Sequence, residues 1–228
     1  MLADAQGAGN VSVPWFEPRF WSARHAVVAE ARGRGQTWIV REGQRELVLR
    51  HYRRGGFIAR LSRDRYVWLG EAATRPFREL ALLTRMRAVD LPVPQPVAAR
   101  YLKHGRTWSG DILVEFLPQT QTLAQRLSSG SVSLQTWAAI GRMIARFHAY
   151  GVCHTDLNAH NILLRGPAQT WLIDFDNAAV RRPGFWRDAN LVRLRRSLEK
   201  LNDGPAAGRF DEPQWHCLLS AYRDEARR

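Results

Sequence analysis

The sequence predicts an α+β protein with two lobes, an antiparallel β-sheet with one main helix in the N-terminal half and a mostly helical C-terminal half. Short segments rich in β-branched and aromatic residues, joined by glycine-bearing turns, occupy the first half of the chain. The second half carries long stretches whose apolar residues recur at helical spacing. The change of character places the boundary between an N-terminal lobe with its arm, 1–117, and a helical lobe, 118–228.

Three strands are expected at the start of the sheet. They are AVVAEA, TWIV and ELVLRHY, joined by the glycine-rich RGRGQ and by the tight turn EGQR. A helix should begin at Thr74, which is a good N-cap, with Pro76 in the first turn where its missing N–H is harmless. Two further strands, VAARYL and GDILVEFL, complete the predicted sheet.

The second half is dominated by predicted helices at 134–150, 189–201 and about 211–226. Gly151 is a helix stop of the usual kind. Short strands ILL and WLI follow. Near the N-terminus, four aromatic residues gather at Trp15, Phe16, Phe20 and Trp21. They are either a packed arm or a membrane-interface belt, where amphipathic rings are common.

The formal net charge is +13, and almost all of the positive charge is arginine because Lys103 and Lys200 are the only lysines. Arginine suits bidentate contacts with phosphate and carboxylate. Nucleic acid, an anionic membrane and an anionic substrate all fit this bias, and so does a genome that favours arginine codons. Cys153 and Cys217 form neither a disulfide framework nor a paired zinc motif.

The N-terminal sequence MLADAQGAGN lacks the features of a signal peptide. No apolar run approaches the roughly 18 residues of a membrane-spanning helix. We therefore expect a protein of the reducing cytosol.

The most informative segment is HTDLNAHN, with Asp156 and Asn161, followed thirteen residues after Asn161 by Asp174-Phe-Asp. Phosphoryl transfer requires Mg²⁺ against the phosphates and a carboxylate that orients and deprotonates the attacking hydroxyl. Mg²⁺ prefers carboxylate and amide oxygens. The pattern predicts Asp156 as catalytic base and Asn161 and Asp174 as magnesium ligands. The alternative is that these are turn residues with local hydrogen bonds.

HxDxxxxN followed by IDF resembles the catalytic loop and metal-binding turn of the protein-kinase-like superfamily. The resemblance implies a bilobal protein-kinase-like fold, with ATP and Mg²⁺ as cofactors, and a scaffold role for His154. It also implies a glycine-rich turn over the phosphates, for which Gly33 and Gly35 have the right position.

The resemblance further implies a basic residue on the third strand that contacts the phosphates and pairs with a helix glutamate. Arg50 is the first choice because no lysine precedes Lys103, and Arg53 is the alternative. Glu79 is the expected partner, although an ordinary exposed helix glutamate would also fit the pattern.

Three departures from protein kinases are informative: Thr155 replaces the arginine before the catalytic aspartate, Asn158 replaces a lysine, and Asp176 replaces the glycine of DFG. They indicate a constitutive kinase for a small molecule or glycan. The role of Asp176 is left open.

A narrower resemblance covers nearly the whole chain. The strings LRHYRRGGFIARLSRDRYVWLG, TRPFRELALLTRM, LPVPQPVAARY, HTDLNAHNILL, IDFDNAAVR and NLVRLRRSLEK resemble the 3-deoxy-D-manno-octulosonic acid (Kdo) kinases of Gram-negative bacteria. That family phosphorylates the 4-hydroxyl of Kdo on the lipid A precursor, Kdo-lipid IVA, with ATP. It acts as a peripheral protein on the cytoplasmic side of the inner membrane, during lipopolysaccharide core biosynthesis.

The resemblance implies anionic partners for the arginines: the Kdo-lipid A precursor and the anionic membrane surface. We expect at least one of two arginine clusters to face the membrane or the substrate, and the alternative is that they are solvated basic faces without a partner. The clusters are Arg53, Arg54, Arg60, Arg63 and Arg65, and Arg193, Arg195 and Arg196. Nucleic acid is not expected as a partner. The alternatives are another small-molecule kinase such as a core heptose or aminoglycoside kinase, a basic nucleic-acid-binding module, and a non-catalytic nucleotide-binding scaffold.

Overall fold

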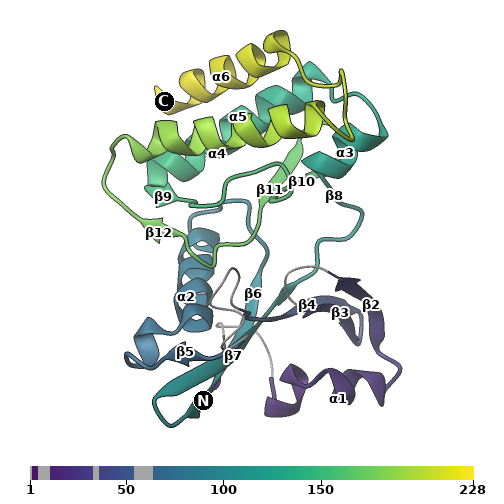
Figure 1. The fold of residues 1–228 in the computed structure, drawn as a ribbon, viewed down its shortest axis with the longest axis vertical. Helices are drawn as coiled ribbons and strands as arrows, with labels where there is room; N and C mark the ends of the chain where they lie inside the picture. Colours follow the sequence, from purple (N-terminus) through teal and green to yellow (C-terminus); the bar gives the residue numbers. More distant parts are fainter. Residues whose placement is uncertain (1, 5–10, 33–35, 54–63) are drawn as a thin grey trace. The chain divides into compact units, whose positions relative to one another are not determined.

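The computed structural model describes residues 2–4, 11–32, 36–53 and 64–228 (Figure 1). The chain forms two compact units. Unit 1 comprises Met1–Arg85 and Pro94–Leu117, and unit 2 comprises Met86–Val93 and Pro118–Arg228. The segment Met86–Val93 groups with the C-terminal unit, so each unit consists of two separate stretches of the chain. The predicted division has a single boundary, after Leu117.

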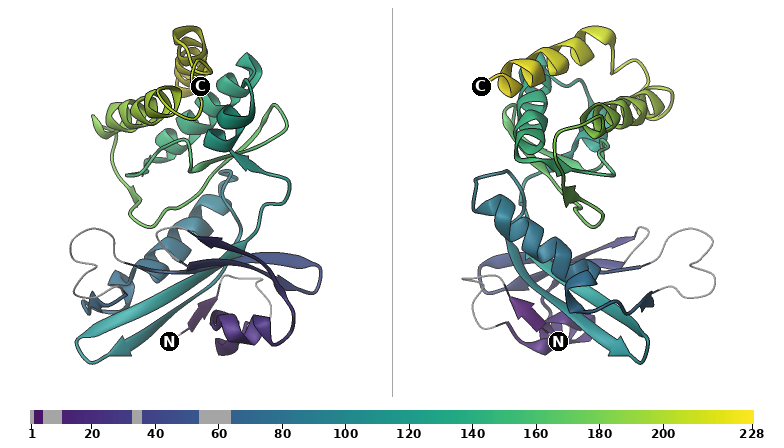
Figure 2. Two further views of the ribbon diagram at one scale, coloured as in Figure 1. Left: turned by 45° about the vertical axis from the view of Figure 1, so that its right-hand side comes forward. Right: turned by 90° about the vertical axis from the view of Figure 1, so that its left-hand side faces the viewer.

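Unit 1 is built on an antiparallel sheet in the order β1-β6-β7-β4-β3-β2, with β5 paired to β7 (Figure 2). Its strands are β1 (Leu2–Asp4), β2 (Val27–Arg32), β3 (Gln36–Glu42), β4 (Arg45–His51), β5 (Tyr66–Val67), β6 (Pro96–His104) and β7 (Thr107–Glu115). Its helical segments are η1 (Val13–Phe16), α1 (Pro18–Ser22), η3 (Glu71–Ala73) and α2 (Arg75–Arg87), whose last two residues fall in unit 2.

The N-terminal aromatics form a packed arm on the sheet. Phe16 and Trp21 are buried with Leu47, Leu49 and other sheet residues in one apolar cluster. Successive side chains of a strand point to opposite faces, so Arg50 points away from this cluster. Its guanidinium contacts Glu79 of α2, which places α2 on the other face of the sheet.

Unit 2 combines four helices with short strands. The helices are α3 (Leu123–Ser129), α4 (Leu134–Tyr150), α5 (Trp186–Asn202) and α6 (Glu212–Ala226). The strands are β8 (Gln121–Thr122), β9 (Val152–Cys153), β10 (Ile162–Arg165), β11 (Gln169–Leu172) and β12 (Ala179–Val180). The hairpin of β10 and β11 pairs with β8, and β12 pairs with β9.

Helix α4 is the central support of unit 2. Its apolar stripe, including Trp137, Ile140 and Phe147, is almost fully buried. Gly141 allows the backbone of α6 to approach closely, because an added Cβ would clash with the carbonyl oxygen of Leu218. Gly151 ends α4 in the left-handed conformation, at a φ of 92°, as the sequence predicts.

The predicted α+β class is confirmed. Helix α5 begins at Trp186, three residues earlier than the predicted 189, and the sequence reasoning did not predict β1, α1 or α3. Short elements with few apolar positions give weak periodicity, so these omissions have a common cause. Within the described residues no helix combines the length and the apolar character needed to cross a bilayer.

Candidate functional site

The segment with the predicted catalytic residues is a loop between β9 and β10 in unit 2. Leu157 and Ala159 are buried and anchor the loop in the core of the unit. Asp156 is exposed, whereas Asn161 is only 9% exposed, just before β10. The alternation of apolar and polar residues in this short segment therefore places the acidic group outward on a fixed backbone.

His154 supports the loop from inside unit 2. Its Nδ1 lies 3.3 Å from the backbone nitrogen of Asp156, and its Nε2 lies 3.0 Å from the carbonyl oxygen of Ile173. A backbone N–H only donates and a carbonyl only accepts, so these contacts assign the ring proton to Nε2. The backbone N–H of His154 donates to the buried Asn190 side chain, at 3.2 Å. His154 thus holds the loop against the strand that leads to Asp174.

Asn161 is oriented by the loop itself. Its Nδ2 donates to the carbonyl oxygen of Asp156 at 2.9 Å and lies 3.4 Å from the Asp156 carboxylate. The amide nitrogen is engaged in this way, and Oδ1 remains the atom with which Asn161 would bind a cation. The Asn161 carbonyl accepts from the N–H of Ile173 at 3.0 Å, which couples the loop directly to the end of the hairpin.

Asp174 has a backbone conformation that the sequence alone did not reveal. Its φ of 66° lies in the left-handed region, which non-glycine residues rarely adopt and which is found at functional sites more often than elsewhere. Phe175 next to it is buried against Phe147 and His154. The packed ring fixes the turn, and Asp174 remains exposed.

A third contact joins the loop to this turn, where the Thr155 hydroxyl donates to the Asn177 carbonyl at 3.3 Å. Unit 2 therefore brings together Asp156, Asn161 and the Asp174 turn. The two candidate magnesium ligands supply an amide and a carboxylate oxygen, a donor set that suits Mg²⁺. Among the described residues, no group of three or more His, Cys, Asp or Glu side chains is placed to hold a metal ion.

In unit 1 the predicted pair of Arg50 and Glu79 is present. The Arg50 guanidinium contacts the Glu79 carboxylate, and the hydroxyl of Tyr52 donates to the same carboxylate oxygen. Glu79 and Tyr52 are buried, whereas about a quarter of the Arg50 side chain is exposed. Burial first, and then the negative charge of Glu79, raise the pKa of Tyr52 well above its usual value, so its hydroxyl keeps its proton.

The structure describes both candidate arginines. Arg50 forms the ion pair with Glu79, and Arg53 is exposed just after β4. Gly33 and Gly35, the predicted phosphate turn, lie outside the described residues. Tyr52 was missed by the sequence reasoning, although a signal existed, because it follows Arg50 by two positions and strand residues two apart share a face.

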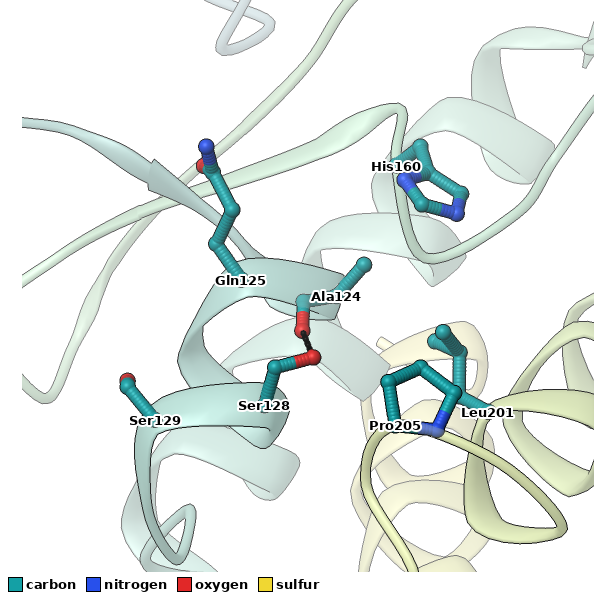
Figure 3. Close-up of a pocket in the computed structure, with 7 residues that line it drawn as sticks. All are labelled: Ala124, Gln125, Ser128, Ser129, His160, Leu201 and Pro205. Atoms are coloured by element: carbon teal, nitrogen blue, oxygen red, sulfur yellow. Dashed lines mark hydrogen bonds between the residues drawn. The ribbon is translucent and has the colours of Figure 1, made fainter.

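A pocket of about 340 Å³ borders the catalytic loop (Figure 3). It is lined by Ala124, Gln125, Ser128, Ser129, His160, Leu201 and Pro205. In Figure 3 the imidazole of His160 stands across from α3, and the Ser128 hydroxyl donates to the Ala124 carbonyl at 3.0 Å. Sequence reasoning did not single out this pocket, because its lining comes from three segments that are distant in the chain.

Comparison with known proteins agrees with this arrangement. The model of the lipopolysaccharide kinase (Kdo/WaaP) family matches residues 18–222. A 3-deoxy-D-manno-octulosonic acid kinase from Xylella fastidiosa is 46% identical over 202 residues, covering 88% of this chain and 80% of the relative. The kinase of that name from Photobacterium profundum is 40% identical over 207 residues, covering 91% and 87%.

A third relative with this name, from Haemophilus influenzae, is 40% identical over 216 residues, which cover 91% of this chain and 89% of the relative. A solved structure described as WaaP in complex with acyl carrier protein aligns with a TM-score of 0.59 at 18% identity, covering 98% of this chain and 89% of the other. That likeness establishes the kinase-like fold. The family match and the identities together show that the chain belongs to the lipopolysaccharide kinase (Kdo/WaaP) family.

Proposed function

We propose that this protein is an ATP-dependent sugar kinase that transfers a phosphoryl group to the 4-hydroxyl of Kdo in Kdo-lipid IVA, in lipopolysaccharide core biosynthesis. The observation that carries the proposal is the joined arrangement of Asp156, Asn161 and the Asp174 turn in a chain 46% identical to a kinase of that name. The geometry supports phosphoryl transfer, and the sequence similarity supports the choice of acceptor.

Asp156 is the proposed catalytic base. Its carboxylate is exposed, and its backbone is held by the Nδ1 of His154 and by Asn161. A carboxylate in this setting accepts a hydrogen bond from the acceptor hydroxyl, orients its oxygen towards the phosphoryl group and takes its proton as the new bond forms.

Asn161 and Asp174 are the proposed magnesium ligands. Bound Mg²⁺ would neutralise charge on the phosphate oxygens during transfer. Asn161 would bind through Oδ1, because its Nδ2 donates to Asp156. Asp174 would bind through its carboxylate, which the left-handed backbone and the buried Phe175 hold in a fixed place.

Arg50 is the proposed phosphate-binding cation of unit 1. Glu79 and Tyr52 restrict the guanidinium to one side, and its exposed fraction is the part that would contact phosphate. Gly33 and Gly35 are proposed to cover the phosphates with backbone N–H groups.

The proposed setting is the cytoplasmic side of the bacterial inner membrane, with the protein bound peripherally. The acceptor carries a Kdo carboxylate and lipid phosphates, and the chain has a net charge of +13, so attraction to an anionic surface is expected. Within the predicted clusters, Arg193 and Arg196 are exposed, whereas Arg195 pairs with Glu199 and Glu212.

The test is ADP release by the pure full-length chain with ATP, Mg²⁺ and Kdo-lipid IVA, compared with a heptose-bearing core acceptor. We expect turnover with the Kdo acceptor, loss of turnover in Asp156→Ala, and normal turnover in Asp224→Ala, which removes an exposed carboxylate from α6. NMR of the product should locate the phosphate on the 4-position. Turnover only with the heptose acceptor would overturn the choice of substrate, and nucleotide binding without turnover on any acceptor would favour the scaffold alternative.

A further inference from the structure

The most exposed large hydrophobic side chain among the described residues lies just after the candidate metal turn. Phe185 is 93% exposed, in the connection from β12 to α5 (Figure 1). Val180, at the end of β12, is 46% exposed. Between them stand Arg181, Arg182, Pro183 and Gly184, all exposed. We refer to residues 181–185 as the 181–185 loop.

The base of this loop is firmly bonded to unit 2. At its start, the Arg181 N–H donates to the Gly151 carbonyl at 2.8 Å, continuing the pairing of β12 with β9. At its end, the indole N–H of Trp186 donates to the Arg182 carbonyl at 2.7 Å, and the Trp186 ring packs edge-on against His148. Phe185 is therefore exposed on a loop whose backbone is hydrogen-bonded to unit 2 at both ends.

The charge of the loop complements an anionic surface. Arg181 and Arg182 are exposed, and among the described residues no hydrogen bond or ion pair from either side chain is formed. The segment 180–188 contains three arginines and a single acid, Asp188. Arg187 is turned inward, because its guanidinium donates to the His148 carbonyl at 2.7 Å.

An exposed aromatic ring beside unpaired arginines matches the chemistry of a bilayer interface. Phenylalanine, like tryptophan and leucine, is common on the apolar face of segments that enter a bilayer interface. Arginines near the headgroups are attracted to lipid phosphates. We propose that the 181–185 loop docks unit 2 on an anionic lipid bilayer, with Phe185 inserted into the interface and Arg181 and Arg182 against the headgroup phosphates. The inference deepens the proposed function, and it rests on it insofar as the acceptor is a membrane lipid.

The position of the loop gives the docking a consequence for the site. Strand β12 pairs with β9 through Ala179 and Cys153, and Cys153 is followed directly by His154 of the catalytic loop. The 181–185 loop and the catalytic loop each follow directly from one of these two paired strands. A contact between the 181–185 loop and lipid would therefore hold the catalytic loop near the membrane surface. Such an arrangement favours an acceptor hydroxyl that lies just above the bilayer.

The test is co-sedimentation of the full chain with vesicles of equal parts phosphatidylglycerol and phosphatidylcholine, with pure phosphatidylcholine vesicles as reference. Near an anionic surface each arginine changes binding roughly fivefold, so Arg181→Gln with Arg182→Gln should weaken it about 25-fold. Phe185→Ser should weaken binding about tenfold. Phe185→Trp should bind the vesicles as well as the unaltered chain, since tryptophan favours the interface.

Matched controls come from unit 1. Leu69→Ser removes another highly exposed apolar side chain, which is 78% exposed. The double variant Arg45→Gln with Arg106→Gln removes two exposed arginines. We expect both control variants to bind vesicles as the unaltered chain does. Equal losses in loop and control variants would show that vesicle binding does not depend on this loop and would overturn the proposal. So would unchanged binding of Phe185→Ser, with its melting temperature intact, or capture of the loop by a protein partner without vesicle binding.

Kinase assays separate this proposal from the proposed function. With a water-soluble, deacylated Kdo acceptor, the loop variants should keep their kcat/KM, and with the acceptor embedded in vesicles they should lose it in proportion to binding. Loop-dependent vesicle binding by a chain that turns over neither acceptor would refute the proposed function and leave the docking surface standing.

Discussion

The two units of the protein bury different kinds of polar group. The described part of unit 1 buries the charged residues Glu79, Arg100 and Asp111, whereas unit 2, which is described throughout, buries no Asp, Glu, Lys or Arg. The buried polar residues of unit 2 are Thr136, His148, His154, Asn161, Thr170 and Asn190. Unit 1 therefore relies on paired charges inside, and unit 2 presents its acids outside on a neutral framework.

This difference fits the role proposed for each unit. In unit 1 the proposed phosphate-binding cation, Arg50, is held by the buried carboxylate of Glu79. A second ion pair, Arg100–Asp111 at 2.9 Å, connects β6 to β7. In unit 2 the proposed base and the proposed cation ligand, Asp156 and Asp174, would need access to a substrate hydroxyl and a cation. Both are exposed, and their backbone is held by neutral donors and acceptors. The comparison predicts that changes in unit 1 affect stability and function together, whereas changes to the acids of unit 2 affect function alone.

The largest expected effect is that of a change at Asp156, and it should fall on catalytic activity and not on stability. Asp156→Asn should lower kcat by about 10²–10⁴-fold, because a general base contributes about that much to proton transfer. The free energy of unfolding should change by less than about 0.5 kcal/mol, since the side chain is exposed. Steady-state kinetics and urea denaturation of the same preparation measure the two quantities. A comparable loss of stability would contradict the separation drawn for unit 2.

Glu79→Ala in unit 1 should destabilise the fold by about 3 kcal/mol, because removing one partner of a buried ion pair leaves the other uncompensated. Nucleotide affinity should fall as well, since Arg50 and Tyr52 both lose their common acceptor. Chemical denaturation and nucleotide titration are the measurements. Glu30→Ala, which removes an exposed glutamate of β2, is the control. Unchanged stability in Glu79→Ala would contradict the account of unit 1.

Tyr52→Phe keeps the ring and removes one hydrogen bond to Glu79, which should cost about 2 kcal/mol because the acceptor is charged. The KM for ATP should rise while kcat with saturating ATP stays close to normal, since the hydroxyl shares the Glu79 carboxylate with Arg50, the proposed phosphate-binding cation. A lower kcat at unchanged KM would show that Tyr52 acts otherwise.

The smallest net effect should be the change of the free energy of unfolding with pH, because two histidines contribute with opposite signs. Burial, reinforced by the Arg187 charge and opposed by a hydrogen bond with Asn190, lowers the pKa of His148 in unit 2 from 6.5 to about 4. The folded state therefore binds this proton less readily than the unfolded state, and the associated stability is full above pH 6.5 and lost as the pH falls towards 4. Between pH 7 and pH 5 the loss is about 2 kcal/mol.

The pKa of His51 in unit 1 is shifted in the opposite direction. Its hydrogen bond with Asp111 raises its pKa, so its contribution is present below pH 6.5 and is lost as the pH rises through the raised value. His148→Gln should therefore reduce the destabilisation on acidification, and His51→Gln should increase it. Denaturant unfolding at pH 7 and pH 5 checks both variants, and the same response from both would refute the contrast between the units.

Much of the site could be predicted from the sequence because its parts are local. Asp156, Asn161 and Asp174 sit within one loop and one hairpin, whose bounds follow from short apolar runs and a glycine helix stop. The α+β class and the family resemblance rest on the same short-range patterns. The role of each residue in catalysis stays a prediction until the variants are measured.

Other features depend on contacts between residues distant in the chain. That Arg50 contacts a carboxylate 29 residues away, and that Tyr52 shares it, depends on how α2 packs on the sheet. The burial of Trp21, the proton on Nε2 of His154 and the left-handed φ of Asp174 likewise follow from tertiary neighbours.

The sequence by itself determined which residues are chemically suited to phosphoryl transfer, the order in which they occur and the family to which they belong. Only the tertiary structure decided that Arg50 is paired with Glu79 and that Phe185 is left uncovered. Hydrophobic periodicity and turn chemistry act over a few residues, whereas burial and ion pairing are properties of the surfaces that packing brings together.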